Sequence, residues 1–162
     1  MTAGAATIPT PTVMNKPISI RPLEEKTYEV PDDEIPKARR RILLLEDDGP
    51  LASHLKLFLE TSGFEVNVAK DGLEGLKQIM AADFDIIICD MLMPNLPGNM
   101  FYTAVERAKP DLVKRFIFIT GHDGDPKIAA FLKQIRGLCL FKPFQMHQLT
   151  ETIGVVLKKN GL

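Results

Sequence analysis

The chain has 162 residues, of which 45% are hydrophobic and 25% are charged, and its net charge is −1. This composition is ordinary for a globular protein, and the near-neutral charge argues against a broad surface for nucleic acid. No apolar run approaches the ~18 residues of a membrane-spanning helix, and the first residues lack the pattern of a secretory signal. The only two cysteines, Cys89 and Cys139, lie inside apolar runs and are interpreted as reduced core residues. We therefore expect a cytoplasmic protein that binds neither nucleic acid nor a membrane.

The first part of the chain differs in composition from the rest. Residues 1–22 are rich in Thr, Ala and Pro, and residues 23–37 are dominated by charged residues and prolines. Neither stretch has a helical or strand period, and neither could bury enough apolar surface to offset the entropy lost on ordering. We expect residues 1–37 to form a disordered or loosely attached arm, and residues 38–160 to form one folded domain.

In the folded part, short apolar runs alternate with stretches of helical periodicity. The five runs, each bounded by charged or turn residues, are 42–45, 66–69, 84–89, 116–119 and 138–141. Continuous runs of this length are typical of strands that are buried on both faces of a parallel sheet. In the second helical stretch, Leu73 and Met80 are expected to lie on the apolar face. Five strands alternating with five helices predict a three-layer α/β domain with helices on both faces of the sheet.

Charged and hydroxyl side chains directly follow four of the five apolar runs. They are Glu46, Asp47 and Asp48 after the first run, Asp90 after the third, Thr120 after the fourth and Lys142 after the fifth. In an open parallel sheet, ligands bind beyond the carboxyl ends of the strands. We therefore expect these side chains to meet at one edge of the sheet.

The chemistry of such a cluster is restricted. Carboxylates ~4 Å apart at a partly buried surface repel by ~4 kcal/mol, so the cluster needs a cation. An all-oxygen site that leaves water positions open favours Mg²⁺, which would attract a phosphoryl group. Thr120 and Lys142 could then help to neutralise the phosphoryl charge. Asp90 is best placed to act as the nucleophile and form an acyl phosphate, whereas Asp48 is interpreted as a helix N-cap.

Four segments that carry these residues resemble the response-regulator receiver domain of two-component signalling. They are ILLLEDD at 42–48, CDMLMPNLPG at 89–98, ITG at 119–121 and FKPF at 141–144. They occur in the family's order and spacing, and the resemblance covers the chain from about residue 40 to residue 158. The resemblance implies a doubly wound, flavodoxin-like sheet with the strand order 2-1-3-4-5.

The resemblance also implies a role for each site residue. Asp90 is the phosphoacceptor, and Mg²⁺ is bound by Glu46, Asp47, Asp90 and the backbone carbonyl of Leu92. Thr120 is the switch hydroxyl, Lys142 pairs with the phosphoryl group, and the bond before Pro143 is cis. The chain departs from the family at Cys139, where an aromatic residue is usual. We therefore expect a weak output switch, or one in which Phe141 takes over the coupling.

These observations predict a stand-alone response regulator, since no recognisable output segment follows the fifth helical stretch. It would accept a phosphoryl group from a histidine kinase or a phosphotransfer protein and change its affinity for an unidentified downstream protein. It would catalyse only its own phosphorylation and dephosphorylation, and would not be an enzyme acting on an external substrate. Two alternatives are weighed against this. A non-phosphorylated docking module would require one of the site residues to be missing, and an aspartyl-phosphate phosphohydrolase would require an Asp at the position of Leu92.

Overall fold

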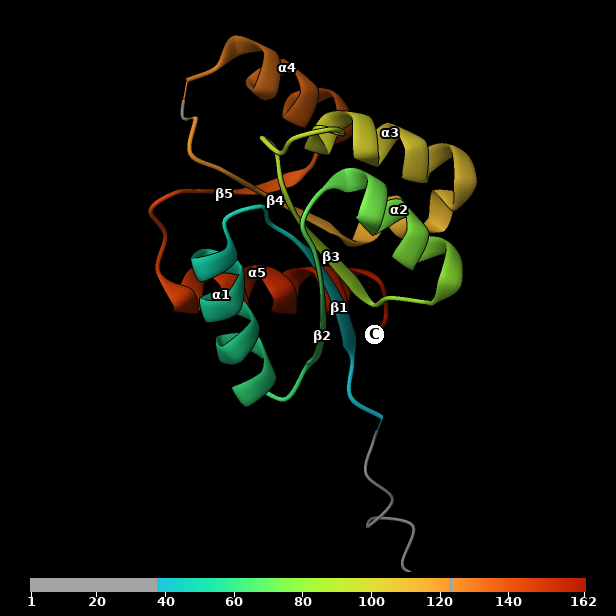
Figure 1. Cartoon of the computed structure of the whole chain (residues 1–162), viewed down its shortest axis with the longest axis vertical. Coiled ribbons are helices and arrows are strands. Elements are labelled where there is room, and N and C mark those ends of the chain that lie inside the picture. The colour runs from blue at the N-terminus through green and yellow to red at the C-terminus, as the bar shows by residue number, and fades with distance from the viewer. Residues whose placement is uncertain (1–37, 123) are drawn as a thin grey trace, which may run out of the picture. The chain divides into compact units, whose positions relative to one another are not determined.

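The computed structural model describes residues 38–122 and 124–162, so the expected arm at residues 1–37 lies outside the described part of the chain. The strands are β1 (Arg41–Leu45), β2 (Glu65–Ala69), β3 (Ile86–Asp90), β4 (Phe116–Thr120) and β5 (Leu138–Phe141) (Figure 1). The helices are α1 (Gly49–Thr61), α2 (Gly72–Ala81), α3 (Gly98–Ala108), α4 (Pro126–Ile135) and α5 (Met146–Lys159). A 3-10 helix that the sequence analysis did not predict, η2 (Pro110–Arg115), lies between α3 and β4. None of the helices in the described part combines the length and the hydropathy that a membrane crossing requires.

The five strands form one parallel sheet in the order β2-β1-β3-β4-β5, which confirms the predicted order. Helices α1 and α5 pack on one face, and α2, α3 and α4 pack on the other (Figure 1). The predicted three-layer α/β architecture is therefore confirmed. In such a sheet all carboxyl ends of the strands lie at one edge, and this edge collects the candidate site residues.

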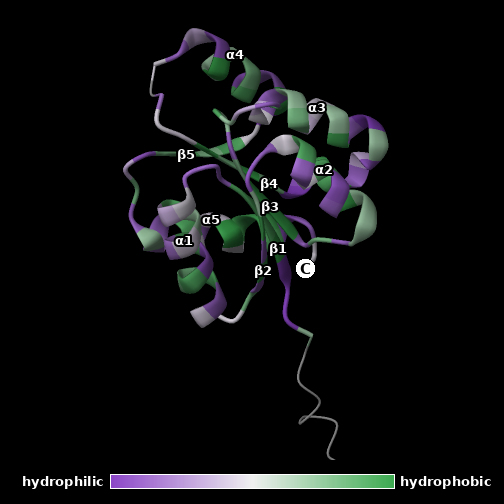
Figure 2. Ribbon diagram, viewed as in Figure 1, coloured by the Kyte–Doolittle hydropathy of each residue, from purple (hydrophilic) through white to green (hydrophobic). Residues whose placement is uncertain are grey.

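The core consists of two apolar layers, one on each face of the sheet, and the central strands between them are strongly hydrophobic (Figure 2). Side chains of β1 alternate between the layers: Ile42 and Leu44 contact the layer of α1 and α5, whereas Leu43 and Leu45 contact the other. All four are fully buried. Full burial stabilises each side chain by about 1.5–3 kcal/mol, so the central strands give the site a rigid support.

The predicted apolar face of α2 is wrong in part. Leu73 and Met80 are 51% and 65% exposed, because the helix buries Gly72, Gly75 and Ile79 instead. A side chain at Gly75 would lie 2.5 Å from a methyl group of Leu45, so the helix approaches the sheet closely along this line. Leu73 directly follows Gly72, and Met80 directly follows Ile79. Consecutive residues of a helix point about 100° apart, so both side chains point toward solvent.

The expectation that every strand is buried on both faces is wrong for both edge strands: β2 is half-buried at Asn67 and Val68, and β5 is more open. Its side chains are half-buried, and Phe141 is 44% exposed. The physical reason is the strand order, since β5 is an edge strand with β4 as its single neighbour. The third run also starts later than predicted: β3 begins at Ile86, while Phe84 is buried just before it, with the Arg41 guanidinium 5.1 Å above its ring.

Candidate functional site

Three carboxylates meet at the carboxyl edge of the sheet, as predicted. Glu46 follows β1 and Asp90 ends β3, and these strands are neighbours whose register pairs Leu45 with Cys89. Glu46, Asp47 and Asp90 each offer an oxygen, and these oxygens lie within 4.8 Å of one another. Glu46 and Asp90 are 2% and 6% exposed, whereas Asp47 is exposed. The cluster is therefore buried at its base and open to water at Asp47.

Lys142 connects the two buried carboxylates. Its Nζ donates to Asp90 Oδ2 at 2.7 Å and to Glu46 Oε2 at 2.9 Å. The backbone N–H of Lys142 donates to the carbonyl of Thr120 at 2.8 Å, which extends the register of β5 with β4 beyond the end of the strand. The Lys142–Pro143 bond is cis, as predicted. The ammonium thus crosses the end of β4 to reach Asp90 on β3.

The electrostatics of this group depend on burial and on the ion pairs. Burial raises the pKa of Glu46, and the hydrogen bond from Lys142 opposes that rise. Burial alone would lower the pKa of Lys142, but the hydrogen bonds to Asp90 and Glu46 outweigh it, so the pKa of Lys142 lies above its ordinary value. Lys142 is therefore charged at neutral pH, and its ammonium contacts two of the three acidic side chains. The cluster keeps an excess of negative charge that favours a further cation.

The donor set fits a hard divalent cation such as Mg²⁺, since all available ligand atoms are oxygens. The loop after β3 offers one more oxygen, the backbone carbonyl of Leu92. Among the described residues, none donates a hydrogen bond to this carbonyl, whereas the Leu92 N–H donates to Asp90 Oδ1 at 2.9 Å. Three of the residues expected to hold Mg²⁺, namely Glu46, Asp47 and Asp90, thus lie together, and the Leu92 carbonyl stays the predicted fourth ligand.

The remaining predicted residues lie at the same edge with different degrees of contact. Thr120 ends β4 and is fully buried, and its hydroxyl accepts the N–H of His122 at 3.2 Å; within the described residues it makes no hydrogen bond to Asp90. Phe141 pairs with Thr120 in the β4–β5 register, and Cys139 packs half-buried against the core layer of α2, α3 and α4. Phe141 therefore lies beside Thr120 at the edge of the sheet that holds the site, and the coupling role expected for it and for Cys139 stays a prediction.

Asp48 is the N-cap of α1, as predicted, and its side chain accepts the N–H of Leu51 at 2.9 Å. Gly98, at the start of α3, was not singled out in the sequence. A side chain there would lie 2.6 Å from the backbone oxygen of Asp90 and 2.9 Å from Met91 Cα. Its N–H donates to the Met91 carbonyl at 3.1 Å. This glycine lets the loop after β3 close tightly behind the phosphoacceptor candidate.

Sequence reasoning also missed Asp71 and Asn95. They join the start of α2 to the loop after β3 through a hydrogen bond of 2.9 Å between their side chains. The spacing of Asp71 and Glu74 is a helix-start signal that could have marked the first of them. No local pattern could have paired it with a residue 24 positions later.

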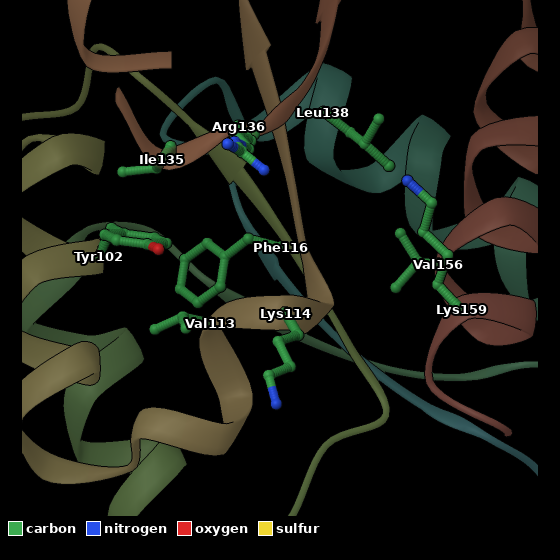
Figure 3. A pocket seen from close by; sticks show the side chains of 10 residues that line it. Tyr102, Val113, Lys114, Phe116, Ile135, Arg136, Leu138, Val156 and Lys159 are labelled. Atoms are coloured by element: carbon green, nitrogen blue, oxygen red, sulfur yellow. The ribbon is translucent and has the colours of Figure 1, made fainter. Parts of the chain in front are cut away.

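A separate cavity of about 230 Å³ is lined by apolar and basic side chains (Figure 3). Among its lining residues are Phe116 and Leu138, the first residues of β4 and β5, together with Tyr102 and Lys159. Because the strands are parallel, their first residues lie at the opposite edge of the sheet from Asp90. The cavity is therefore not part of the candidate site.

Comparisons with known proteins agree with this geometry. Residues 42–154 match the family described as response regulator receiver domain. The transcriptional regulatory protein PrrA of Mycobacterium leprae is 31% identical over 121 residues, covering 75% of this chain and 51% of PrrA. The sensor kinase CckA of Brucella abortus is 28% identical over 124 residues, covering 73% of this chain and 12% of CckA. The chain thus spans about half, or less, of the length of these curated relatives.

Solved structures show the same fold. The CheY-like receiver domain protein of Methanospirillum hungatei has a TM-score of 0.71 at 25% identity, covering 76% of this chain and 98% of that chain. The chemotaxis protein CheY4 of Vibrio cholerae has a TM-score of 0.66 at 29% identity, covering 74% of this chain and 100% of that chain. Receiver domains are in general non-enzymatic signalling modules that act with histidine kinases in phosphorelays. With a family match over 42–154 and the acidic cluster at the edge of the sheet, the chain belongs to the response regulator receiver family.

Proposed function

We propose that this chain transmits a signal by accepting a phosphoryl group on Asp90 from the phosphohistidine of a histidine kinase or a phosphotransfer protein. The observation that carries the proposal is the position of Lys142 Nζ, 2.7 Å from Asp90 and 2.9 Å from Glu46. An ammonium held between two buried carboxylates, next to the exposed Asp47, matches the charge of an incoming phosphoryl group and its counterion.

The transfer itself needs one nucleophile and a way to neutralise charge. A carboxylate oxygen of Asp90 attacks phosphorus, and the new O–P bond forms as the P–N bond to the donor imidazole breaks. The released imidazole nitrogen takes up a proton. Lys142 then donates to a phosphoryl oxygen, and the Thr120 hydroxyl supplies a second hydrogen bond from β4. Mg²⁺, held by Glu46, Asp47, Asp90 and the Leu92 carbonyl, would supply charge neutralisation on the phosphoryl oxygens.

Loss of the phosphoryl group would follow by attack of water on the acyl phosphate. Water can approach from the side of Asp47, the exposed member of the cluster. The domain would therefore catalyse only its own phosphorylation and dephosphorylation. The output would be a changed affinity for a separate protein, with Thr120 as the switch and Cys139 and Phe141 as the coupling residues on β5. The exposed ring of Phe141, paired in register with Thr120, supports this assignment.

The alternatives receive less support from the site. A non-phosphorylated docking module would not need Lys142 to contact both Asp90 and Glu46, yet both contacts are present. A phosphohydrolase of the aspartyl-phosphate type would need an acid two positions after its nucleophile, where Leu92 stands.

The proposal is tested by labelling the protein with acetyl phosphate and Mg²⁺ and measuring the intact mass. We expect one phosphoryl group per chain in the wild type, none in Asp90→Asn, and none in the presence of EDTA. Asp85→Asn is the matched control, because Asp85 directly precedes β3, at the opposite edge of the sheet from Asp90, and accepts the Arg41 N–H at 2.8 Å. Equal labelling of Asp90→Asn and wild type would refute the assignment.

Two finer points have tests of their own. We propose that the domain acts on a separate protein, and detection in the host of an output domain in the same polypeptide would contradict this. The cytoplasmic location is proposed from the two free cysteines, Cys89 and Cys139, and recovery in the membrane or secreted fraction would contradict it.

A further inference from the structure

A buried carboxylate stands at the start of α2, outside the acidic cluster. Asp71 is 7% exposed and is the N-cap of this helix, where its Oδ1 accepts the N–H of Glu74 at 2.9 Å. Its second oxygen, Oδ2, accepts a hydrogen bond of 2.9 Å from the side-chain amide of Asn95, in the loop between β3 and α3. Asp71 thus joins two segments that are distant in the sequence.

Helix capping alone does not explain this arrangement. Two other aspartates cap helices here: Asp48, which is exposed, and Asp125, which is half-buried. Among the described residues, neither accepts a hydrogen bond from the side chain of another loop. A cap needs one oxygen, which a serine could also supply. Burial of a carboxylate costs free energy unless its oxygens accept hydrogen bonds. The second oxygen of Asp71 accepts one from Asn95. These hydrogen bonds also lower the pKa of Asp71 and so keep it ionised. The bond from the Glu74 N–H has the larger effect, and the bond from the Asn95 amide has the next largest.

Asn95 is suited to this contact by its backbone. Its φ of 65° lies in the left-handed region, which glycine and asparagine tolerate best. Glycine would satisfy the backbone equally well, so the amide is what asparagine adds. The next residue, Leu96, packs against the same helix start, since a side chain on Gly72 would lie 2.7 Å from the Leu96 carbonyl oxygen. The tip of the loop is therefore fixed on α2 by a hydrogen bond and by close packing.

The other end of the loop is fixed at the candidate site. The Met91 N–H donates to the carbonyl of Ile119 at 2.9 Å, and the Leu92 N–H donates to Asp90 Oδ1 at 2.9 Å. The Leu92 carbonyl lies between the two anchored points and is the one backbone oxygen assigned to Mg²⁺. The Leu92 carbonyl precedes Asn95 by three residues, with the buried Met93 between them, so a displacement of the loop tip can reach it.

We propose that the hydrogen bond between Asp71 and Asn95 is a latch that positions the Leu92 carbonyl for Mg²⁺ and thereby sets the metal affinity of the site. The proposal rests on the function proposed above. Neither residue belongs to the cluster of Glu46, Asp47 and Asp90, so both are positioning residues. Groups that orient a metal ligand commonly contribute strongly to affinity, because a misdirected ligand must be reoriented each time the ion binds.

The test uses the full chain and Mg²⁺ alone, with the Kd measured by isothermal titration calorimetry on metal-free protein. Asp71→Ser keeps an N-cap but is too short to reach Asn95, and Asn95→Gly keeps the left-handed backbone but loses the amide. We expect each variant to raise the Kd about tenfold. The double variant should bind no more weakly than the weaker single one, because both changes remove the same interaction. In metal-free protein, the backbone amide signal of Leu92 should shift or broaden in each variant.

Gln78→Met is the control, since it removes a different tether of α2, the 2.9 Å hydrogen bond from the Gln78 amide to the Val68 carbonyl. We expect its Kd for Mg²⁺ to be unchanged. The latch is overturned if Asn95→Gly binds Mg²⁺ as tightly as the wild type, or if the effects of the single variants on the Kd multiply in the double variant. It is also overturned if Gln78→Met loses as much Mg²⁺ affinity as the latch variants. A wild type that binds no Mg²⁺ would overturn the proposed function itself, whereas wild-type binding with unchanged variants overturns the latch alone.

Discussion

Replacing Gly98 by alanine tests how closely the loop behind Asp90 is packed. The added methyl group would lie 2.6 Å from the Asp90 carbonyl oxygen, 2.9 Å from Met91 Cα and 3.2 Å from Cys89 Sγ. The first two are backbone atoms that cannot rotate away, so α3 or the end of β3 must shift by about 1 Å. Overpacking of this kind costs about 1–3 kcal/mol.

Part of this cost is offset in the unfolded state. Exchanging glycine for alanine reduces the freedom of the unfolded chain and contributes about 0.4–1 kcal/mol of stability. We therefore expect Gly98→Ala to lower the free energy of unfolding by about 1–2 kcal/mol. The displacement of Asp90 should also slow labelling by acetyl phosphate. Urea unfolding followed by circular dichroism suits this chain, because it contains no tryptophan.

The matched control is Gly121→Ala, next to Thr120 at the same edge of the sheet. A side chain at this position would meet nothing within 4 Å. We expect its free energy of unfolding to stay within about 0.5 kcal/mol of the wild type. If Gly98→Ala is as stable as the wild type, or if Gly121→Ala loses as much unfolding free energy as Gly98→Ala, then close packing behind Asp90 is not the reason for the glycine.

Three further predictions concern the site and its coupling. Lys142→Met should lower the free energy of unfolding in EDTA by about 3 kcal/mol, because it leaves two buried carboxylates without their cation. Mg²⁺ should then stabilise this variant more than the wild type; equal stabilisation in a urea titration would contradict the reasoning. Burial, and to a smaller extent the nearby charge of Asp90, raises the pKa of the Cys139 thiol to about 11. Alkylation of Cys139 by iodoacetamide, followed by peptide mass, should therefore keep accelerating up to pH 10, and a plateau near pH 8 would refute this. Phe141→Ala should reduce the chemical-shift changes that beryllofluoride induces in residues 126–158, and unaltered changes would exclude it from the coupling.

Much of the fold could be predicted from the sequence because its signals are local. Five apolar runs, such as Ile42–Leu45, are separated by helical stretches, and a parallel sheet is the arrangement that buries runs of this kind. The same logic predicted the acidic edge, since residues that directly follow parallel strands must meet at one end of the sheet. Glu46, Asp90 and Lys142 lie together for this reason, and the residue types alone supply the two carboxylates and the ammonium that interact there.

Other features depend on contacts between segments that are distant in the sequence, and only the tertiary structure decided them. Periodicity placed Leu73 and Met80 on the buried face of α2, but the close approach at Gly75 turned both toward solvent. Nothing near Asp71 indicates that Asn95 is its partner. The physical reason is the same in each case. The hydrophobic pattern determines that an element is buried. Packing of the whole domain determines which side of a helix touches the sheet and which loop reaches a buried carboxylate.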